Sequence, residues 1–498
     1  MNQSNSYVLS IDQGTTNTRA IIFNKNGHII SKSSIQLSQY FPHNGWVEHD
    51  PNVIWNDVIR VINNAVLLGK ITFNQIDAIG ITNQRETTII WDRKTGEVIY
   101  NALVWQDRRT SNICTNLKLQ NLENDIQKKT GLLIDPYFSA TKIGWLLDNI
   151  PNARIKADRG ELAFGTIDSF LLWRLTKGKV HATDATNASR TMLFNIHSQM
   201  WDEELLKLFN IPKSILPAVK NSSDNFGHTD KSIFGIEIPI TGIAGDQHSA
   251  TVGQACFHPG MIKSTYGTGC FMVLNTGKQA IVSNNRLLTI VAYRLNNEVT
   301  YGLEGSIFSA GTGTQWLRDN LHFFQHSEDT ARISQSVQDT LGVYFVPAFT
   351  GLGAPYWDPD ARAAILGVTR ETNINHIVRA QLESVGYQSL DLLKAMINKE
   401  KIHCDFVRVD GGMVANDWLC EFLADILNIP VERPSILDTT ALGVAFLAGL
   451  QIGWYSNLQE ITNIWKARSI FYPIMGEQQR NILYNGWCNA VSKIVHSK

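Results

Sequence analysis

Short apolar runs, broken by glycine-containing turns, mark the strands expected in the first half of the chain. Residues 7–11 and 19–23 are two such runs, and the polar segment Asp-Gln-Gly-Thr-Thr-Asn lies between them. Residues 76–82 and 163–168 have the same apolar character and are predicted to form buried strands. The first two strands are therefore expected to form a hairpin around the polar segment.

A helical pattern lies between these strands. Asp50-Pro51 has the residue types preferred at a helix N-cap and at the first helical position. The apolar residues that follow recur at helical spacing and predict one buried face, formed by Ile54, Val58, Val61, Ile62 and Ala65. Strands alternating with helices predict an α/β fold.

The same arrangement returns in the second half of the chain. Residues 261–275 again place a Gly/Thr turn between two apolar runs, and residues 406–412 form an apolar run that ends in a glycine pair. A helix is expected from about Asn416. Another helix is expected to bury one face, formed by Val378, Leu382, Val385, Leu392 and Met396. The repetition predicts two duplicated domains, residues 1–252 and 253–498.

Length, net charge and cysteine spacing limit the kinds of molecule and compartment that the chain is expected to have. A chain of 498 residues usually holds more than one core, and its net charge of -1 gives no attraction for nucleic acid or anionic lipid. The six cysteines lack zinc-ligand spacing, which favours a reducing compartment. The longest apolar stretch, residues 441–455, is shorter than the roughly 20 residues of a membrane span. We expect a soluble, cytoplasmic protein that acts on a small molecule, without a signal peptide or membrane span.

Glycine turns supply the candidate chemistry. Backbone N–H groups in tight glycine turns can hold phosphate, hydroxyl groups add donors, and a nearby acid can hold Mg²⁺. The first turn has these parts, and further glycine turns occur at 266–270, 311–315 and 410–416. A purely structural turn is the alternative for each of them. Together they predict a nucleotide held between two halves of the chain.

Other nucleotide-binding motifs are missing from the sequence. There is no GxxxxGK[ST] motif, no GxGxxG motif after a strand, and no HRD and DFG pair. A P-loop protein, a Rossmann dehydrogenase and a protein kinase are therefore not indicated.

Longer blocks carry a specific resemblance. The DQGTT, Gly/Thr and DGG turns resemble the phosphate and adenosine motifs of the sugar kinase/actin/Hsp70 ATPase superfamily, whose fold consists of two duplicated actin-like (ribonuclease H-like) domains around an active-site cleft. "YFSATKIGWLLDN" and "AILGVTRETNINHIVRAQLES" resemble the two signatures of the FGGY carbohydrate kinases. "GITNQRETT", "GIAGDQHSA" and "PAFTGLGAPYWDPDARAAILG" are similar to those members that phosphorylate glycerol. The resemblance spans residues 12 to about 450.

The resemblance implies transfer of the γ-phosphoryl group of MgATP to glycerol, an ATP:glycerol 3-phosphotransferase activity with sn-glycerol 3-phosphate and ADP as products. It places the general base at Asp246, for which a helix N-cap role is the alternative. A carboxylate is ionised at neutral pH and can accept the hydroxyl proton. The residues implied to bind or flank glycerol are Arg85, Glu86, Tyr137, Asp246, Gln247, Trp105 and Phe271. Without the resemblance, the adjacent charges suggest a solvated surface pair and the aromatic residues suggest core positions.

The nucleotide side also follows from the resemblance. The residues implied to bind ATP or ADP are Thr15, Thr16, Asn17, Arg19, Thr268, Gly311, Gln315, Gly412 and Asn416. Asp12 is implied to order Mg²⁺, through water. Members of the family usually have serine where this chain has Asn17. The resemblance also implies a homo-oligomer, either a dimer or a tetramer.

Three rival functions remain at the sequence level. Another FGGY kinase, acting on a pentulose, erythritol or gluconate, would share the ATP motifs. An actin-like or Hsp70-like protein would use ATP as a switch without a polyol acceptor. A catalytically inactive relative would lack some of the polar positions, all of which this chain retains.

Overall fold

Two mixed sheets form the framework of the computed structural model, which describes residues 6–358, 360–397 and 402–495. In the first sheet β1 pairs antiparallel with β2 and parallel with β5. From one edge to the other it contains β13 (Ile240–Gly245), β5 (Ile76–Asn83), β1 (Tyr7–Gln13), β2 (Asn17–Phe23) and β3 (Ile29–Gln36).

The second sheet repeats this topology. β14 pairs antiparallel with β15 and parallel with β20, as β1 does with β2 and β5. Its strands are, in order, β16 (Leu288–Leu295), β17 (Glu298–Ile307), β15 (Cys270–Gly277), β14 (Ile262–Tyr266), β20 (Val407–Asp410), β21 (Val431–Pro434) and β22 (Ala467–Phe471). The shared order confirms the predicted α/β fold with a duplicated unit.

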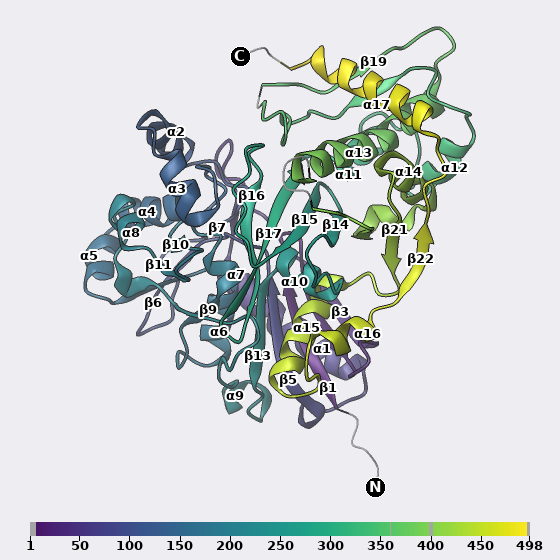
Figure 1. Ribbon diagram of the computed structural model, residues 1–498. Helices are drawn as coiled ribbons and strands as arrows, with labels where there is room; N and C mark the ends of the chain where they lie inside the picture. Colours follow the sequence, from purple (N-terminus) through teal and green to yellow (C-terminus); the bar gives the residue numbers. More distant parts are fainter. Residues whose placement is uncertain (1–5, 359, 398–401, 496–498) are drawn as a thin grey trace.

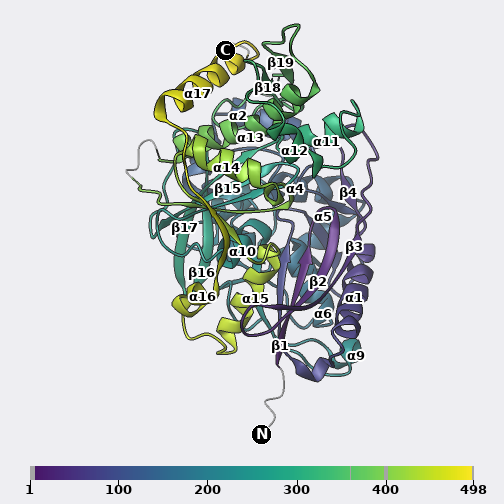
Figure 2. The same cartoon turned by 90° about the vertical axis from the view of Figure 1, so that its right-hand side faces the viewer.

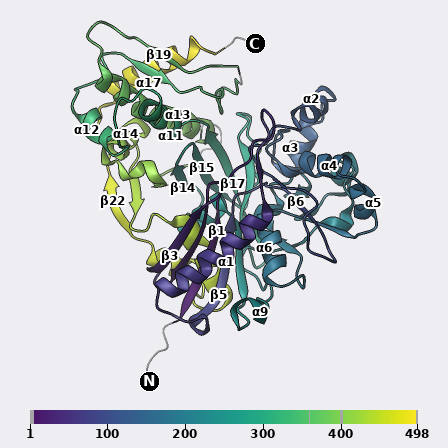
Figure 3. The ribbon, with the colours of Figure 1, turned by 180° about the vertical axis from the view of Figure 1, so that it is seen from behind.

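Helices from distant parts of the chain cover the first sheet. α1 (Pro51–Leu68) packs on β2 and β3, and Figure 3 shows it in front of the sheet. α15 (Thr439–Gln451) packs on β1, β5 and β13, and its yellow-green ribbon lies beside the purple strands β1 and β5 in Figure 1. Alternating residues of β1 accordingly enter different cores, Leu9 with α1 and Val8 with α15. The last part of the chain therefore completes the first sheet.

Local signals explain where the two long predicted helices lie. The Asp50 carboxylate accepts the Asn52 N–H at 2.8 Å and caps α1, as predicted. The five apolar residues predicted for its inner face are all buried. α13 (Ile374–Ile397) likewise buries the predicted face from Val378 to Met396. These sequence predictions are confirmed.

Additional elements extend each half. Those inserted between β3 and β13 are α2 (Ser111–Leu119), α3 (Glu123–Thr130), α4 (Ser139–Asn149), α5 (Ala153–Asp158), α6 (Ile167–Leu175), α7 (Ala185–Ala188), α8 (Glu203–Leu208), α9 (Lys231–Phe234), β4 (Glu48–His49), β6 (Ile89–Asp92), β7 (Ala102–Leu103), β8 (Leu162–Gly165), β9 (Ala182–Asp184), β10 (Phe194–Asn195), β11 (Met200–Trp201) and β12 (Ala218–Lys220). Among these inserted elements, α2, α3, α4, α5 and α8 form most of a separate apolar core.

The second half carries its own set, and in Figure 2 α17 lies at the end of the molecule opposite β1. This set comprises α10 (Asp246–Gly253), α11 (Gly311–Asp319), α12 (Asp329–Gln335), α14 (Asp417–Leu427), α16 (Leu458–Ile464), α17 (Glu477–Ser492), β18 (Tyr344–Val346) and β19 (Ala364–Leu366). Short 3₁₀ helices lie at Phe73–Gln75, Lys213–Ile215 and Gly412–Ala415.

One predicted strand is wrong in part. β8 ends at Gly165, and Ile167 and Asp168 begin α6. Thr166 has the extended backbone of an N-cap, and its hydroxyl donates to Asp168 Oδ1 at 2.5 Å. A polar residue before an acid is a helix-start signal, so the apolar run stops being a strand there. The domain boundary at 252/253 stays a prediction. Among the described residues, no helix is long and apolar enough to cross a membrane.

Candidate active site

The turn between β1 and β2 is shorter than predicted because both strands extend into the motif. Asp12 and Gln13 belong to β1, Asn17 belongs to β2, and the Gly14 N–H donates to the Asn17 carbonyl oxygen at 2.9 Å. Thr15 is half-buried and Thr16 and Asn17 are exposed. The Asn17 amide donates to Thr16 Oγ1 at 3.0 Å. Hydroxyl groups and backbone N–H groups are thus concentrated at one end of the sheet.

Asp12 and Arg19 face each other across β1 and β2. Arg19 donates to the buried Asp12 carboxylate and, at 3.0 Å, to Asp438 Oδ1. Lys32 adds a 3.3 Å contact to Asp438 Oδ2. Burial raises the pKa of Asp12, while the positive charge of Arg19 opposes that rise. The predicted metal and phosphate residues therefore neutralise each other here, and Asp438 is a neighbour that the sequence did not indicate.

The second glycine turn, Gly267–Gly269, contacts the start of α11. The Gly311 N–H donates to the Gly267 carbonyl oxygen at 3.0 Å, and the Thr312 N–H donates to the Thr268 carbonyl oxygen at 3.1 Å. A Cβ on Gly311 would lie 2.6 Å from that Gly267 oxygen, so only glycine allows this approach. Thr268 and Gln315 are exposed.

The third glycine segment follows β20. Gly411 has a φ of 93°, and a Cβ there would lie 2.3 Å from the Tyr266 carbonyl oxygen. A Cβ on Gly412 would meet nothing within 4 Å, so the backbone there borders open space. Asn416 caps α14 by accepting the Leu419 N–H at 3.2 Å.

Predicted nucleotide residues thus fall into two groups. Thr268, Gly311, Gln315, Gly412 and Asn416 belong to adjoining segments of the second half. The other group comprises Thr15, Thr16, Asn17 and Arg19, on the first hairpin. Within the residues that the structure describes, no hydrogen bond or ion pair joins the two groups.

Asp246 is the first residue of α10, directly after β13. The N-cap is Gly245, so Asp246 lies one position inside the helix. Its Oδ1 accepts the Gln247 N–H at 2.7 Å and contacts Arg85 Nε at 3.0 Å. Oδ2 has no partner among the described residues, and the side chain is 32% exposed. One carboxylate oxygen is therefore fixed and the other is available to a ligand.

Arg85 and Glu86 follow β5 and are both buried, so they do not form a surface pair. Arg85 Nε lies 3.9 Å from Glu86 Oε1, and Arg85 Nη2 donates to the Tyr137 hydroxyl at 3.4 Å. The guanidinium lies 5.9 Å from the centre of the Phe271 ring. Glu86 has a φ of 61°, a left-handed conformation that is costly for a non-glycine residue.

Aromatic residues complete this group. The Trp105 and Tyr137 rings meet edge to face with centres 5.4 Å apart. Trp105 Nε1 also donates to Thr15 Oγ1 at 2.8 Å, which links the aromatic side to the first glycine turn. Gln247 Oε1 accepts from Lys263, whose ammonium also lies 3.4 Å from the Phe271 carbonyl oxygen. The structure brings all seven predicted polyol-side residues together.

Two charged residues of this group were not predicted from the sequence. Arg190, just after α7, pairs with Glu86, and Glu304 of β17 pairs with both Arg85 and Arg190. All four side chains are almost completely buried. Burial raises the pKa of Glu86. For Glu304, the attraction of Arg190 and Arg85 outweighs burial and lowers the pKa to about 2. Glu304 is the one acid in residues 299–307 of this strand, and that isolated charge was the available signal.

Other buried polar groups surround the cluster. Burial lowers the pKa of Lys263, which donates to Thr265 Oγ1 at 2.8 Å. Burial also lowers the pKa of His248 well below its ordinary value. Lys142, also buried, donates to the Tyr137 carbonyl oxygen at 3.2 Å. Within the described residues, no group of three or more His, Cys, Asp or Glu side chains is arranged to hold a metal ion.

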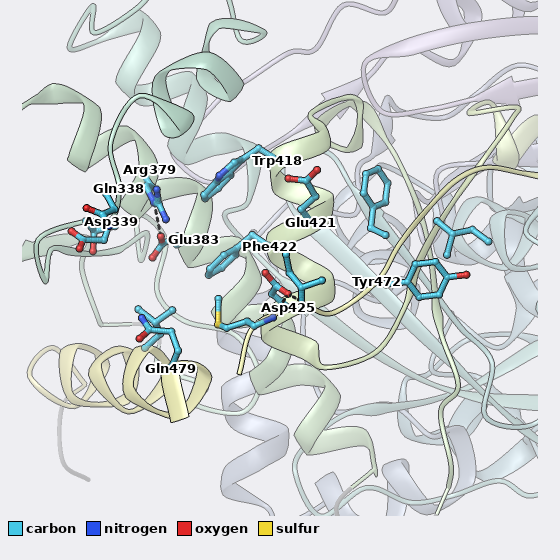
Figure 4. A pocket seen from close by; sticks show the side chains of 16 residues that line it. Gln338, Asp339, Arg379, Glu383, Trp418, Glu421, Phe422, Asp425, Tyr472 and Gln479 are labelled. Carbon is cyan, nitrogen blue, oxygen red and sulfur yellow. Dashed lines mark hydrogen bonds and ion pairs between the residues drawn. The ribbon is translucent and has the colours of Figure 1, made fainter. Parts of the chain in front are cut away.

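A pocket of about 590 Å³ lies elsewhere, between α13, α14 and the segment leading to α17 (Figure 4). Arg379 and Glu383 pair within it at 2.9 Å, and Asp425 accepts the Ile474 and Met475 N–H groups at 2.7 and 2.9 Å. None of the predicted site residues lines this pocket. The chemistry indicated by the sequence therefore belongs to the cluster around Asp246.

The amino-acid sequence matches the models of a known protein family. The profile for the FGGY family of carbohydrate kinases, N-terminal domain, matches residues 7–253, and the profile for the C-terminal domain of that family matches residues 262–452. A protein of Alcanivorax borkumensis named glycerol kinase is 57% identical over 488 residues and is covered, like this chain, to 98%.

Two solved structures are similar to this chain over nearly their whole length. The crystal structure of Plasmodium falciparum glycerol kinase with ADP covers 99% of both chains with 38% identity and a TM-score of 0.93. The crystal structure of gluconate kinase from Lactobacillus acidophilus also covers 99% of both chains, with a TM-score of 0.88. Its identity of 23% shows a shared fold alone.

Proposed function

The chain belongs to the FGGY family of carbohydrate kinases, and we propose that it transfers the γ-phosphoryl group of ATP to glycerol, giving sn-glycerol 3-phosphate and ADP. The observation that carries the proposal is the position of Asp246. Its free carboxylate oxygen borders the group of donors, acceptors and aromatic rings that the sequence assigned to a polyol. Full-length identity above half to a glycerol kinase supports glycerol as the acceptor.

Glycerol carries three hydroxyl groups, each of which can donate and accept a hydrogen bond. In this proposal Arg85 donates, Glu86 accepts, and the Tyr137 hydroxyl and Gln247 amide do both. The Trp105 and Phe271 rings flank the carbon chain. Phe271 belongs to β15, and Asp246 and Gln247 begin α10, while Arg85, Glu86, Trp105 and Tyr137 are held by their mutual contacts and ion pairs. The groups are therefore pre-positioned, and little ordering is left for the moment of binding.

Asp246 acts as the general base. The attacking glycerol oxygen forms a bond to the γ-phosphorus while the bond from that phosphorus to the β,γ-bridging oxygen breaks and ADP leaves. The hydroxyl proton passes to Asp246 Oδ2. Arg85, held on Oδ1 at 3.0 Å, keeps the carboxylate oriented toward the acceptor.

ATP is held, in this proposal, by the two groups of glycine-turn residues. Thr15, Thr16, Asn17, Arg19 and Thr268 face the phosphates. Gly311, Gln315, Gly412 and Asn416 face the nucleoside, and the open backbone at Gly412 supports that assignment.

The donor set fits a Mg²⁺ ion that arrives with the nucleotide. Mg²⁺ commonly takes one or two protein carboxylates with phosphates and water, so a cage of three protein ligands is not needed. Asp12, buried beside Arg19, would hold it through water. The ion would neutralise charge on the phosphate oxygens.

Three broader assignments accompany this function: the compartment, the oligomeric state and the domain division. The six cysteines form no disulfide among the described residues, which supports a cytoplasmic, reducing compartment. A dimer or tetramer stays a prediction that size-exclusion chromatography with light scattering will test. Two domains, 1–252 and 253–498, are proposed to bind glycerol and the adenosine moiety, respectively.

A coupled assay with glycerol and ATP tests the function. The wild-type chain should phosphorylate glycerol in preference to gluconate, xylulose or erythritol, and inactivity with glycerol would refute the proposal. Asp246→Asn should lower kcat by about 100-fold or more while leaving ATP binding largely intact. Asp50→Asn makes the same chemical change at a helix cap that asparagine also serves, and should retain full activity. Wild-type turnover by Asp246→Asn would remove Asp246 as the base.

A further inference from the structure

Glu304 brings a buried negative charge from the second sheet into the polyol group of the first half. It lies in β17 between β15 and β16, opposite Val273 and Leu288. A strand paired on both sides is a rigid support for a side chain. Arg85, its partner, follows β5 of the first sheet, 219 positions earlier in the chain.

The Glu304 carboxylate is shared by two arginines. One oxygen accepts from Arg85 Nη1, and the other lies 3.3 Å from Arg85 Nη2 and 3.1 Å from Arg190 Nη2. Such bidentate contact fixes the plane of a guanidinium as well as its position. The side chains of Glu304 and Arg85 are each 2% exposed, so water does not compete for these contacts.

Arg190 links Glu304 to Glu86 and Tyr137. Its Nε donates to Glu86 Oε1, and its guanidinium lies 5.3 Å from the centre of the Tyr137 ring. Glu304 therefore contacts two arginines that between them touch Glu86, Tyr137 and Asp246. Within the described part of the chain, no hydrogen bond or ion pair joins Glu304 to a nucleotide-side residue.

The cluster also balances charge. Arg85 and Arg190 are both buried, and each depends on Glu304 and Glu86 for compensation. Without the Glu304 charge, two arginines would share one buried carboxylate, and Arg85 would be drawn more strongly toward Asp246. An uncompensated buried charge is among the most costly changes in a protein interior.

We propose that Glu304 is a positioning residue for glycerol: it holds Arg85 directly, and Glu86 and Tyr137 through Arg190, so that the polyol pocket forms only when β17 lies against the first half. The inference rests on the proposed function, because it concerns the same pocket. Glu304 does not touch the acceptor; it determines where the groups that do so are placed.

The proposal predicts that a change at Glu304 alters the KM for glycerol much more than the KM for ATP. Glu304→Gln keeps the size of the side chain but offers one acceptor oxygen and an amide whose N–H groups face an arginine. The KM for glycerol should rise about tenfold or more, as for a buried charge pair that loses one partner, while the KM for ATP changes less than about threefold. Glu304→Asp keeps the charge and should recover part of the glycerol affinity.

Glu383→Gln is the matched control. Glu383 is an equally buried carboxylate that pairs with Arg379 at 2.9 Å and contacts no predicted site residue. It should lower the melting temperature without a selective change in the glycerol KM. If Glu304→Gln raises both KM values equally, or leaves the glycerol KM unchanged in an active enzyme, Glu304 is not a positioning residue. Inactivity of the wild-type chain toward glycerol would instead refute the underlying function.

A double variant covers the case in which Glu304→Gln does not fold. Arg190→Met combined with Glu304→Gln removes one charge of each sign and should restore the melting temperature. Because Glu86 and Tyr137 then lack their support, the glycerol KM should stay raised about tenfold or more. Recovery of normal glycerol KM in the folded double variant would overturn the proposal.

Discussion

Trp105 joins the polyol side of the site to the first glycine turn through a single hydrogen bond. Its Nε1 donates to Thr15 Oγ1 at 2.8 Å, while its ring packs edge to face on Tyr137. Trp105→Phe keeps an aromatic ring beside Tyr137 and removes the donor. The variant therefore separates the two roles of this side chain.

The expected magnitude follows from the one interaction that is lost. A typical net hydrogen bond contributes about 1 kcal/mol, within a range of about 0.5 to 1.5. At room temperature this corresponds to roughly a 5-fold change in affinity, and at most about 13-fold. Because Thr15 is assigned to the phosphates of ATP, the KM for ATP should rise by that factor. The KM for glycerol should change less, since the ring remains.

Steady-state kinetics with each substrate varied in turn measures both constants. Trp454→Phe is the control, because Trp454 Nε1 donates to Asp77 Oδ2 at 3.1 Å, and neither residue belongs to the proposed site. A Trp105→Phe enzyme with an ATP KM within twofold of wild type would refute the link between Trp105 and the phosphate turn. A larger change in glycerol KM than in ATP KM would show that the ring, and not the donor, matters.

Two further predictions concern the nucleotide face and pH. Gly412→Ala should keep the melting temperature within about 2 °C, because the added Cβ has no atom within 4 Å, yet weaken ADP binding about fivefold or more by occupying the face proposed for the nucleoside; calorimetric titration showing an unchanged Kd would exclude Gly412 from that face. Burial raises the pKa of Asp168 to about 7. The folded chain therefore retains a proton that the unfolded chain releases near pH 4, and stability falls as pH rises between these values. Asp168→Asn should remove this contribution, so its melting temperature relative to wild type should increase from about pH 4 to about pH 7; a constant difference would contradict the assignment.

Local patterns predicted the framework because they depend on neighbouring residues. The Asp50-Pro51 pair and the apolar spacing of α1 specify that helix without reference to the rest of the chain. The error at 163–168 has the same local origin, since Thr166 starts a helix within an apolar run. Motif resemblance indicated the seven polyol-side residues, and the structure brings them together.

Residues that join distant segments were not predictable in the same way. Glu304 and Arg85 are 219 positions apart, and their pairing depends on how β17 meets the end of β5. Asp438 reaches Arg19 only because α15 packs on the first sheet. A lone acid in an apolar strand signals a buried partner, but the sequence does not say which residue that partner is.

The packing of α15 against the first sheet has a consequence for synthesis of the chain. Val8, Ile21 and Ala78 are covered by a helix that begins at Thr439, so synthesis must pass residue 439 before their face of the sheet is closed. Until then an apolar surface is exposed on the nascent chain, a situation that favours chaperone binding or aggregation. A fragment ending near residue 252 would retain that bare surface permanently.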